Sequence, residues 1–342
     1  MKERKMIFIK RDSLVIRFPE IHENAGVKID FQRTLRLPDN GETHYLPPGL
    51  GKFPLRHIED FDLGSNNHLK KRGGVIMPMF QADALWLNFS SINMTGQADY
   101  PIALKIGTGK VCAVSGDNWS SNLNRDPQDY VVVPEQPWLD GYNVGKNIVK
   151  QFVAAPMRQG FTVEEQLTGN ADVGGIQIQA FPMKKEFYEK LNVVPDFAAH
   201  EEMNDIVCCM APESSMEMGL AAGGSMRQEI YEDPYNFEEW DLRATQRCFV
   251  TLANAEQWMD ITGEEPPMRA ISAQTYTDAG LPWFDFYDND NEAISGAKKL
   301  GKIKSIKQID EEKGSDIWPE DGEIQNPNVF SWMRRLVKVG NW

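Results

Sequence analysis

Residues 27–37 decide the fold, and they read VKIDFQRTLRL. Apolar side chains at Val27, Ile29 and Phe31 alternate with polar ones along this stretch. Successive side chains of a β-strand point to opposite faces of a sheet, so the alternation predicts a strand with one buried face. Arg33 is the exception, because it falls on the apolar side. A β-bulge that resets the register would account for it, and a paired, buried arginine is the alternative.

Other segments carry similar signals. Residues 6–18 predict two strands joined by a turn, and residues 102–114 predict a hairpin whose turn is Gly107-Thr108-Gly109-Lys110. Residues 148–167 predict a second hairpin. In residues 176–180, apolar residues alternate with two glutamines, which again indicates a strand. The expected strands do not alternate regularly with helices, which argues against a doubly wound parallel sheet.

These patterns predict an α+β fold that is predominantly β. We expect an antiparallel sandwich or barrel-like sheets with a few peripheral helices. The composition turns polar and acidic near residues 192–205. A β-rich region at 1–195 and a mixed α/β region at 196–342 are therefore expected, which could pack together as one compact unit.

The charge balance limits the classes of partner. The chain has 36 Lys and Arg against 50 Asp and Glu, a net charge of −14 that repels phosphate backbones and anionic lipid. Nucleic acid is therefore disfavoured, and the expected partner is a protein or a small molecule, with the oligomeric state left open. The densest basic run, Lys70-Lys71-Arg72, precedes two glycines and predicts a turn.

The sequence also predicts a cytoplasmic protein. No segment approaches the roughly 18 apolar residues of a membrane span, and the N-terminus has no signal-peptide core. The cysteines lack the spacing of a disulfide framework or a zinc site, so we expect reduced, mostly buried thiols. They are Cys112, Cys208, Cys209 and Cys248.

Familiar site templates each lack a required residue. Gly141–Asn147 has the wrong spacing for a phosphate loop, and His200–Asn204 lacks the second histidine of a zinc helix. Asp288–Lys299 lacks the glycine and the final glutamate of a calcium loop. We therefore predict no metal and no cofactor. The glycine-rich stretch 219–225 predicts a tight turn or a close backbone approach.

Two segments combine a Pro-Trp step with nearby acids, namely EQPWLD at 135–140 and LPWFDFYD at 281–288. Tryptophan offers a face for stacking, and carboxylates can act as acid and base or bind sugar hydroxyls. Alternatively, the Trp residues anchor loops to the core while the acids face water. The candidate catalytic residues are Asp140, Glu164, Glu165 and Asp285, and the candidate ligand-binding residues are Arg33, Gln136, Trp138 and Trp283.

Several segments resemble those of a family of uncharacterised bacterial proteins to which no activity is assigned. They are FQRTLR at 31–36, LPPGLG at 46–51, FPLR at 53–56, PQDY at 127–130, EQPWLDG at 135–141, EEQLTG at 164–169 and AGLPWFD at 279–285. The resemblance spans most of the chain. It implies a free-standing bacterial protein, and it implies no activity, cofactor or catalytic residue.

The function expected from the sequence is that of a non-catalytic β-rich binding or assembly protein. The alternative is a carboxylate-based hydrolase that acts on a carbohydrate-like substrate. A pair of carboxyl groups across one cleft, beside a Trp face, would distinguish the enzyme from the binding protein.

Overall fold

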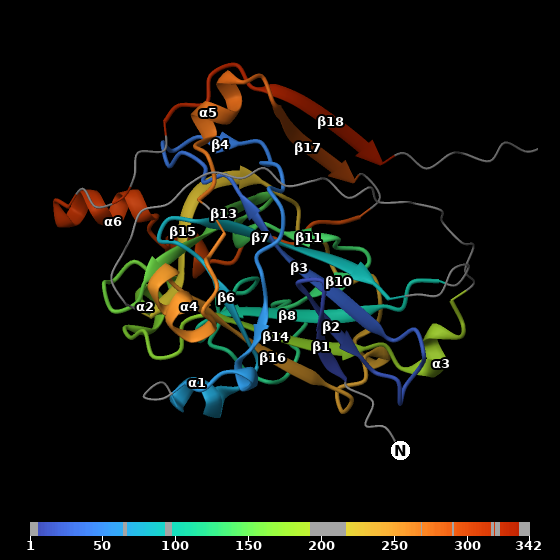
Figure 1. Ribbon diagram of the computed structural model, residues 1–342. Coiled ribbons are helices and arrows are strands. Elements are labelled where there is room, and N and C mark those ends of the chain that lie inside the picture. The colour runs from blue at the N-terminus through green and yellow to red at the C-terminus, as the bar shows by residue number, and fades with distance from the viewer. Residues whose placement is uncertain are drawn as a thin grey trace, which may run out of the picture.

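The computed structural model describes residues 6–63, 67–92, 98–191, 217–267, 269–288, 291–315, 318 and 322–334. Two large open sheets share one hydrophobic core, which contains Ile29 and Phe31 of one sheet and Ile106 and Ile178 of the other. Short helices lie around the periphery (Figure 1). The fold is therefore α+β and predominantly β, as predicted.

The first sheet is antiparallel except where β15 meets β4. Its strands follow the order β1-β2-β3-β7-β13-β15-β4, with β11 paired to β7 and β12 to β13. Their bounds are β1 (Ile7–Lys10), β2 (Ser13–Arg17), β3 (Gly26–Thr34), β4 (Thr43–His44), β7 (Ala84–Ser91), β11 (Trp138–Leu139), β12 (Gly141–Gly145), β13 (Ile148–Pro156) and β15 (Met218–Arg227).

Strand β3 confirms the predicted alternation, because Val27, Ile29 and Phe31 are fully buried. The expected bulge at Arg33 is wrong, since β3 pairs with β7 in one unbroken register along its whole length. Arg33 stays in the ladder and is half-buried. Its guanidinium carbon lies 6.0 Å from the centre of the Phe53 ring, so stacking accommodates the cation on this face.

The second sheet follows the order β10-β8-β14-β16-β6-β5, with β9 paired to β8. The predicted hairpin at 102–114 is present as β8 and β9, and Gly109 in its turn has a φ of +55°. In β14 the apolar residues face the core while Gln177 and Gln179 lie on the outer face. The bounds are β5 (Arg56–His57), β6 (Val75–Pro78), β8 (Ile102–Thr108), β9 (Val111–Cys112), β10 (Val131–Val133), β14 (Ile176–Pro182) and β16 (Gln246–Ala253).

The second expected hairpin, at 148–167, is wrong in its latter half. Residues Val163–Thr168 form helix α2 instead of a strand. The Thr162 side chain accepts a hydrogen bond from the Glu165 backbone N–H, and the Glu165 side chain accepts one from the Thr162 backbone N–H. The helix ends at Gly169, which has a left-handed backbone conformation. This capping box satisfies backbone groups that a strand would leave to a neighbour, and so it favours the helix.

Two further expectations change. The basic run 70–72 forms the last turn of helix α1 (Asn67–Arg72), and the chain reverses after it at Gly73 and Gly74. The glycine-rich stretch 219–225 lies inside β15 and is not a turn. It allows the close backbone approach, because a Cβ on Gly224 would lie 2.5 Å from the carbonyl oxygen of Pro38.

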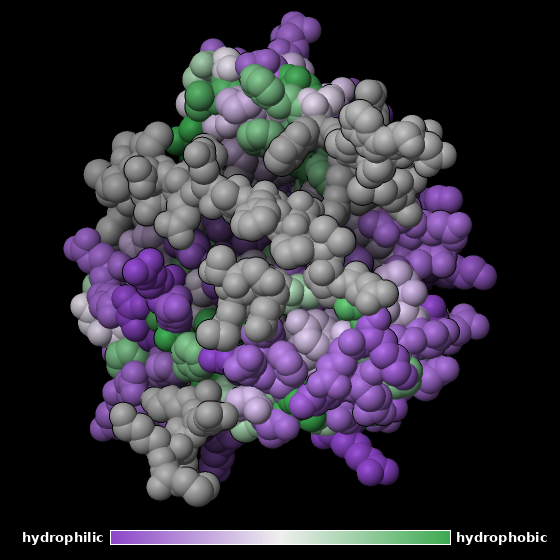
Figure 2. Space-filling model, turned by 90° about the vertical axis from the view of Figure 1, so that its right-hand side faces the viewer, coloured by the Kyte–Doolittle hydropathy of each residue, from purple (hydrophilic) through white to green (hydrophobic). Residues whose placement is uncertain are grey.

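The remaining elements are peripheral. They are α3 (Lys185–Tyr188), α4 (Ala255–Thr262), α5 (Ala273–Asp278), α6 (Ile306–Lys313), the 3₁₀ turns η1 (Ile58–Asp60), η3 (Phe237–Glu239) and η4 (Leu300–Lys302), and the parallel pair β17 (Pro282–Asp288) and β18 (Asn328–Arg334). Hydrophobic side chains gather at the top of the molecule in Figure 2, at the end where Figure 1 places β17 and β18. Leu281, Phe284 and Phe330 are exposed there.

Both large sheets combine strands from before and after residue 195, because β15 pairs with β13 and β16 pairs with β14. Cys112 and Cys248 are buried free thiols. Cys208, Cys209 and His200–Asn204 lie outside the described residues. None of the helices in the described ranges is long and apolar enough to cross a membrane.

Candidate functional site

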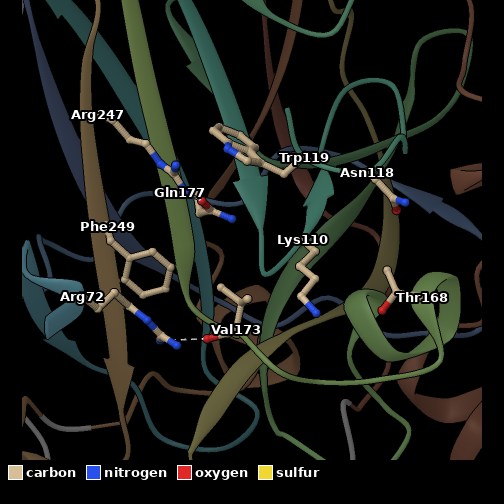
Figure 3. A pocket seen from close by; sticks show the side chains of 9 residues that line it. All are labelled: Arg72, Lys110, Asn118, Trp119, Thr168, Val173, Gln177, Arg247 and Phe249. Carbon is tan, nitrogen blue, oxygen red and sulfur yellow. Dashed lines mark hydrogen bonds between the residues drawn. The ribbon is translucent and has the colours of Figure 1, made fainter. Parts of the chain in front are cut away.

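A cavity of about 610 Å³ opens on the outer face of the second sheet, away from the shared core. Figure 3 shows the side chains that surround it. They come from α1, the turn after β8, the segment that follows β9, α2 and its following loop, β14 and β16. The lining residues are Arg72, Lys110, Asn118, Trp119, Thr168, Val173, Gln177, Arg247 and Phe249.

The floor of the cavity is set by strand register. Gly107 of β8, Gln177 of β14 and Phe249 of β16 are direct neighbours in one row across the sheet. The side-chain amide of Gln177 is held at both ends, because it donates to the Gly109 carbonyl and accepts from the Arg247 guanidinium. This polar floor is therefore fixed without a ligand.

One wall of the cavity is the half-buried Trp119. Its backbone N–H donates to the Lys110 carbonyl at 2.7 Å, so the residue is tied to the hairpin turn. Its ring lies on the backbone of β8, and a Cβ on Gly107 would lie only 2.4 Å from the indole. The indole N–H is buried and has no hydrogen-bond partner within the described part of the chain.

The opposite wall combines Phe249 with Arg72. The Arg72 guanidinium carbon lies 4.5 Å from the centre of the Phe249 ring, and one N–H donates to the Val173 carbonyl at 2.9 Å (Figure 3). Burial lowers the pKa of Arg72 from its usual value, although an arginine side chain stays protonated at neutral pH. Stacking and the carbonyl together hold the cation at the cavity.

Lys110 contributes a third cation from the turn after β8. Its ammonium group forms an ion pair with the exposed carboxylate of Asp172, and this hydrogen bond raises the pKa of Lys110. Asp172 is 58% exposed, so the pair is solvated and open to exchange with another anion.

Glu164 fixes the loop beside Lys110. Its buried carboxylate accepts backbone N–H groups from Gly174 at 2.8 Å and Val173 at 3.2 Å. Burial raises the pKa of Glu164, while these two hydrogen bonds act in the opposite direction. A Cβ on Gly109 would lie 2.1 Å from this carboxylate, so the hairpin turn packs directly against it. The contacts give Glu164 a structural role.

The cavity therefore presents mainly cations and donors. Arg72, Lys110 and Arg247 surround it, and neither arginine forms an ion pair with a carboxylate anywhere in the described ranges. The Val173 carbonyl and the Gln177 amide oxygen at the cavity already accept from these arginines. An oxyanion is the ligand chemistry that this arrangement can bind.

Apart from Glu164 and Glu165 in α2, the residues predicted from sequence lie away from the cavity. Asp140, between β11 and β12, is 3% exposed. Burial raises its pKa to about 7, although the Trp138 side chain donates a hydrogen bond that favours the charged form. One carboxyl oxygen of Asp140 has no partner among the described residues. Glu165 is used in the capping box of α2.

The two Pro-Trp segments do meet. The rings of Trp138 and Phe286 are in contact, with centres 5.0 Å apart and planes at 78°. Trp283, in contrast, is fully buried and donates its indole N–H to Thr277. Asp285 lies 3.9 Å from the guanidinium of Arg227. A joint catalytic role of Asp140 and Asp285 stays a prediction.

Gln136 is bound within the fold. Its amide nitrogen donates to the carbonyls of Trp138 and Glu229, and its amide oxygen accepts from the Tyr231 backbone. Both ends of the side chain therefore join the segment before β11 to the chain that follows β15.

Sequence reasoning did not find the cationic cavity. Its arginines, Arg72 and Arg247, are far apart in sequence and meet only through strand order. The available signals were the polar face of β14 and the lysine in the turn after β8. Neither signal reveals that Arg247 is paired across β16 and β14 with Gln179.

No group of His, Cys, Asp and Glu residues suited to a metal ion occurs in the described part of the chain. Comparison with known protein families, curated proteins and solved structures gives no match to this chain.

Proposed function

We propose that this protein is a non-catalytic binding protein that captures a small oxyanion, either a phosphate or a carboxylate, in the cavity of the second sheet. The convergence of Arg72, Lys110 and Arg247 in a chain of net charge −14 carries the proposal. Guanidinium groups match the geometry of planar carboxylates and of phosphate oxygens, and they form strong charge-assisted hydrogen bonds.

The surroundings support binding rather than chemistry. The buried carboxylate of Glu164, which lies beside the Lys110 turn, accepts backbone N–H groups with both of its oxygens. The Gln177 amide is likewise engaged at both ends. Groups locked in this way preorganise a site and do not move protons.

The size of the site supports a single small molecule. A volume of about 610 Å³ lies within the usual range for small-molecule pockets. The overall negative charge opposes a long polyanion, so nucleic acid is not the proposed ligand. The buried free thiols of Cys112 and Cys248 support a reducing, cytoplasmic setting, which fractionation of the tagged protein would test.

Calorimetric titration with inorganic phosphate, sulfate and acetate tests the proposal. We expect at least one anion to bind, with affinity falling as ionic strength rises. Arg247→Gln should weaken binding by about tenfold or more, because a hydrogen bond to a charged group contributes about 1.5–3 kcal/mol. Arg243→Gln is the matched control, since Arg243 is exposed on the turn before β16 and does not line the cavity.

Binding that is equal in the two variants, or no binding of any of these anions by the wild-type protein, would contradict the proposal.

The hydrolase is kept as a second proposal because Asp140 has a pKa of about 7 and because the two Pro-Trp segments meet. A carboxyl group with such a pKa suits general acid catalysis at neutral pH. Assays with aryl glycosides should then show turnover that Asp140→Asn abolishes. No turnover of any aryl glycoside by the wild-type protein would remove this proposal.

A further inference from the structure

We infer that the ligand carries its anionic group on a flat ring, as in an aryl or heteroaryl phosphate or carboxylate, and that this ring stacks on Trp119. The inference rests on the proposed function and names the class of ligand that the same cavity takes.

Trp119 is built as a platform. One side of its indole lies on the β8 backbone at Gly107, where no side chain intervenes, and the ring also borders the cavity. The segment that carries Trp119 is held in place by hydrogen bonds from buried Lys105. The ammonium group of Lys105 donates to the Asn122 carbonyl at 2.6 Å and pairs with Asp129 at 2.5 Å. A rigid, half-exposed indole loses little freedom when a ring stacks on it.

The other aromatic wall is already occupied. Arg72 covers the Phe249 ring at 4.5 Å, whereas the cations beside the Trp119 ring, Lys105 and Arg247, lie farther from its centre, at 5.5 and 5.6 Å. Trp119 is therefore the less crowded of the two rings. Gly107 and Phe249 are separated by one intervening strand. Two strand spacings place their backbones ~10 Å apart. Gln177 lies on the strand between them and lines the same cavity.

The anionic group and the ring have separate recognition elements. Arg72 and Lys110 lie along one side of the cavity and Trp119 along another, with Gln177 between Phe249 and Trp119 (Figure 3). The indole N–H of Trp119 is a buried donor with no acceptor in the described ranges.

Matched pairs of ligands test this inference. Calorimetry compares phenyl phosphate with methyl phosphate, and benzoate with acetate. We expect a ring preference of about tenfold in at least one pair, because stacking on an aromatic side chain is a substantial part of such affinities. The pair that shows the preference identifies phosphate or carboxylate as the anionic group.

Variants of Trp119 assign the preference to its ring. Trp119→Leu should reduce the preference, measured as the ratio of phenyl phosphate to methyl phosphate affinity or of benzoate to acetate affinity, to about twofold. Trp119→Phe keeps a flat face and should retain most of the preference, which keeps the inference testable if the Leu variant does not fold. Trp86→Leu, at a half-buried Trp on the first sheet, is the control and should change neither value.

Equal binding within both pairs, or a preference that Trp119→Leu leaves intact, would overturn the stacking inference. If none of the four anions binds, the proposed function fails first, so the two failures are distinguishable.

Discussion

At the scale of single residues, Asp172 competes with the ligand for Lys110. Because the ion pair is exposed on both sides, its removal should free the ammonium group at little cost. Asp172→Asn should therefore raise the affinity for the bound anion by about two- to fivefold in a calorimetric titration. Glu312→Gln breaks a similarly exposed pair with Lys304 outside the cavity and should leave the affinity unchanged. A weaker affinity in Asp172→Asn would contradict this assignment.

Asp140 should make the free energy of unfolding depend on pH. Its folded pKa of about 7 lies above the usual 3.8, so the folded state holds the proton more tightly. Stability is then full below about pH 4, falls as the pH rises towards 7, and is level above it. The total loss is about 4 kcal/mol at most.

Asp140→Asn should abolish this fall when unfolding by urea is measured between pH 4 and 8. Asp278→Asn, at the exposed end of α5, should preserve it. A wild-type stability that is constant across this range would show that Asp140 ionises as freely in the folded as in the unfolded chain.

Sequence alone could place single residues only where local pattern determines them. The burial of Val27, Ile29 and Phe31 follows from alternation, and their environment confirms it. Gln136 could not be separated from a ligand-binding residue, because its partners Glu229 and Tyr231 lie more than ninety positions later. Polar side chains that hydrogen-bond to distant segments of the chain look the same in the local sequence as polar side chains that bind ligands.

At the scale of elements, α2 connects the fold to the cavity, because Glu164 in its first turn holds the loop beside Lys110. Thr162→Ala removes the cap of this helix and should lower the free energy of unfolding by about 1 kcal/mol. It should also weaken anion binding severalfold, as measured by calorimetry.

The matched control for that prediction is Ser305→Ala, which removes an equivalent capping box from α6. Its stability should fall by a similar amount while the anion affinity is kept. Equal losses of affinity in both variants would mean that α2 has no particular link to the cavity.

Strands were predictable where consecutive segments of the chain each alternate apolar and polar residues, as in β1, β2 and β3. The secondary structure of residues 161–168 was not predictable in this way, because their apolar residues suit either a strand or a helix. The capping box decides for the helix. The basic run before Gly73 forms a helical turn for a related reason, since the two glycines at positive φ end α1 instead of forming the bend alone.

At the scale of the whole molecule, the site depends on sheet order. Strand β16, from the second half of the chain, pairs with β14 and places Arg247 and Phe249 beside residues from positions 107–119. Alternation predicted two-sided strands but contains no information on which strands become neighbours. The predominantly β class could therefore be predicted, and the cavity could not.

Crystals grown or soaked with tungstate, a tetrahedral dianion that resembles phosphate and gives a strong anomalous signal, test the central claim most directly. We predict an anomalous peak in the cavity, within hydrogen-bonding distance of at least two of Arg72, Lys110 and Arg247. Peaks found only elsewhere, in a crystal whose packing leaves the cavity open, would contradict the account.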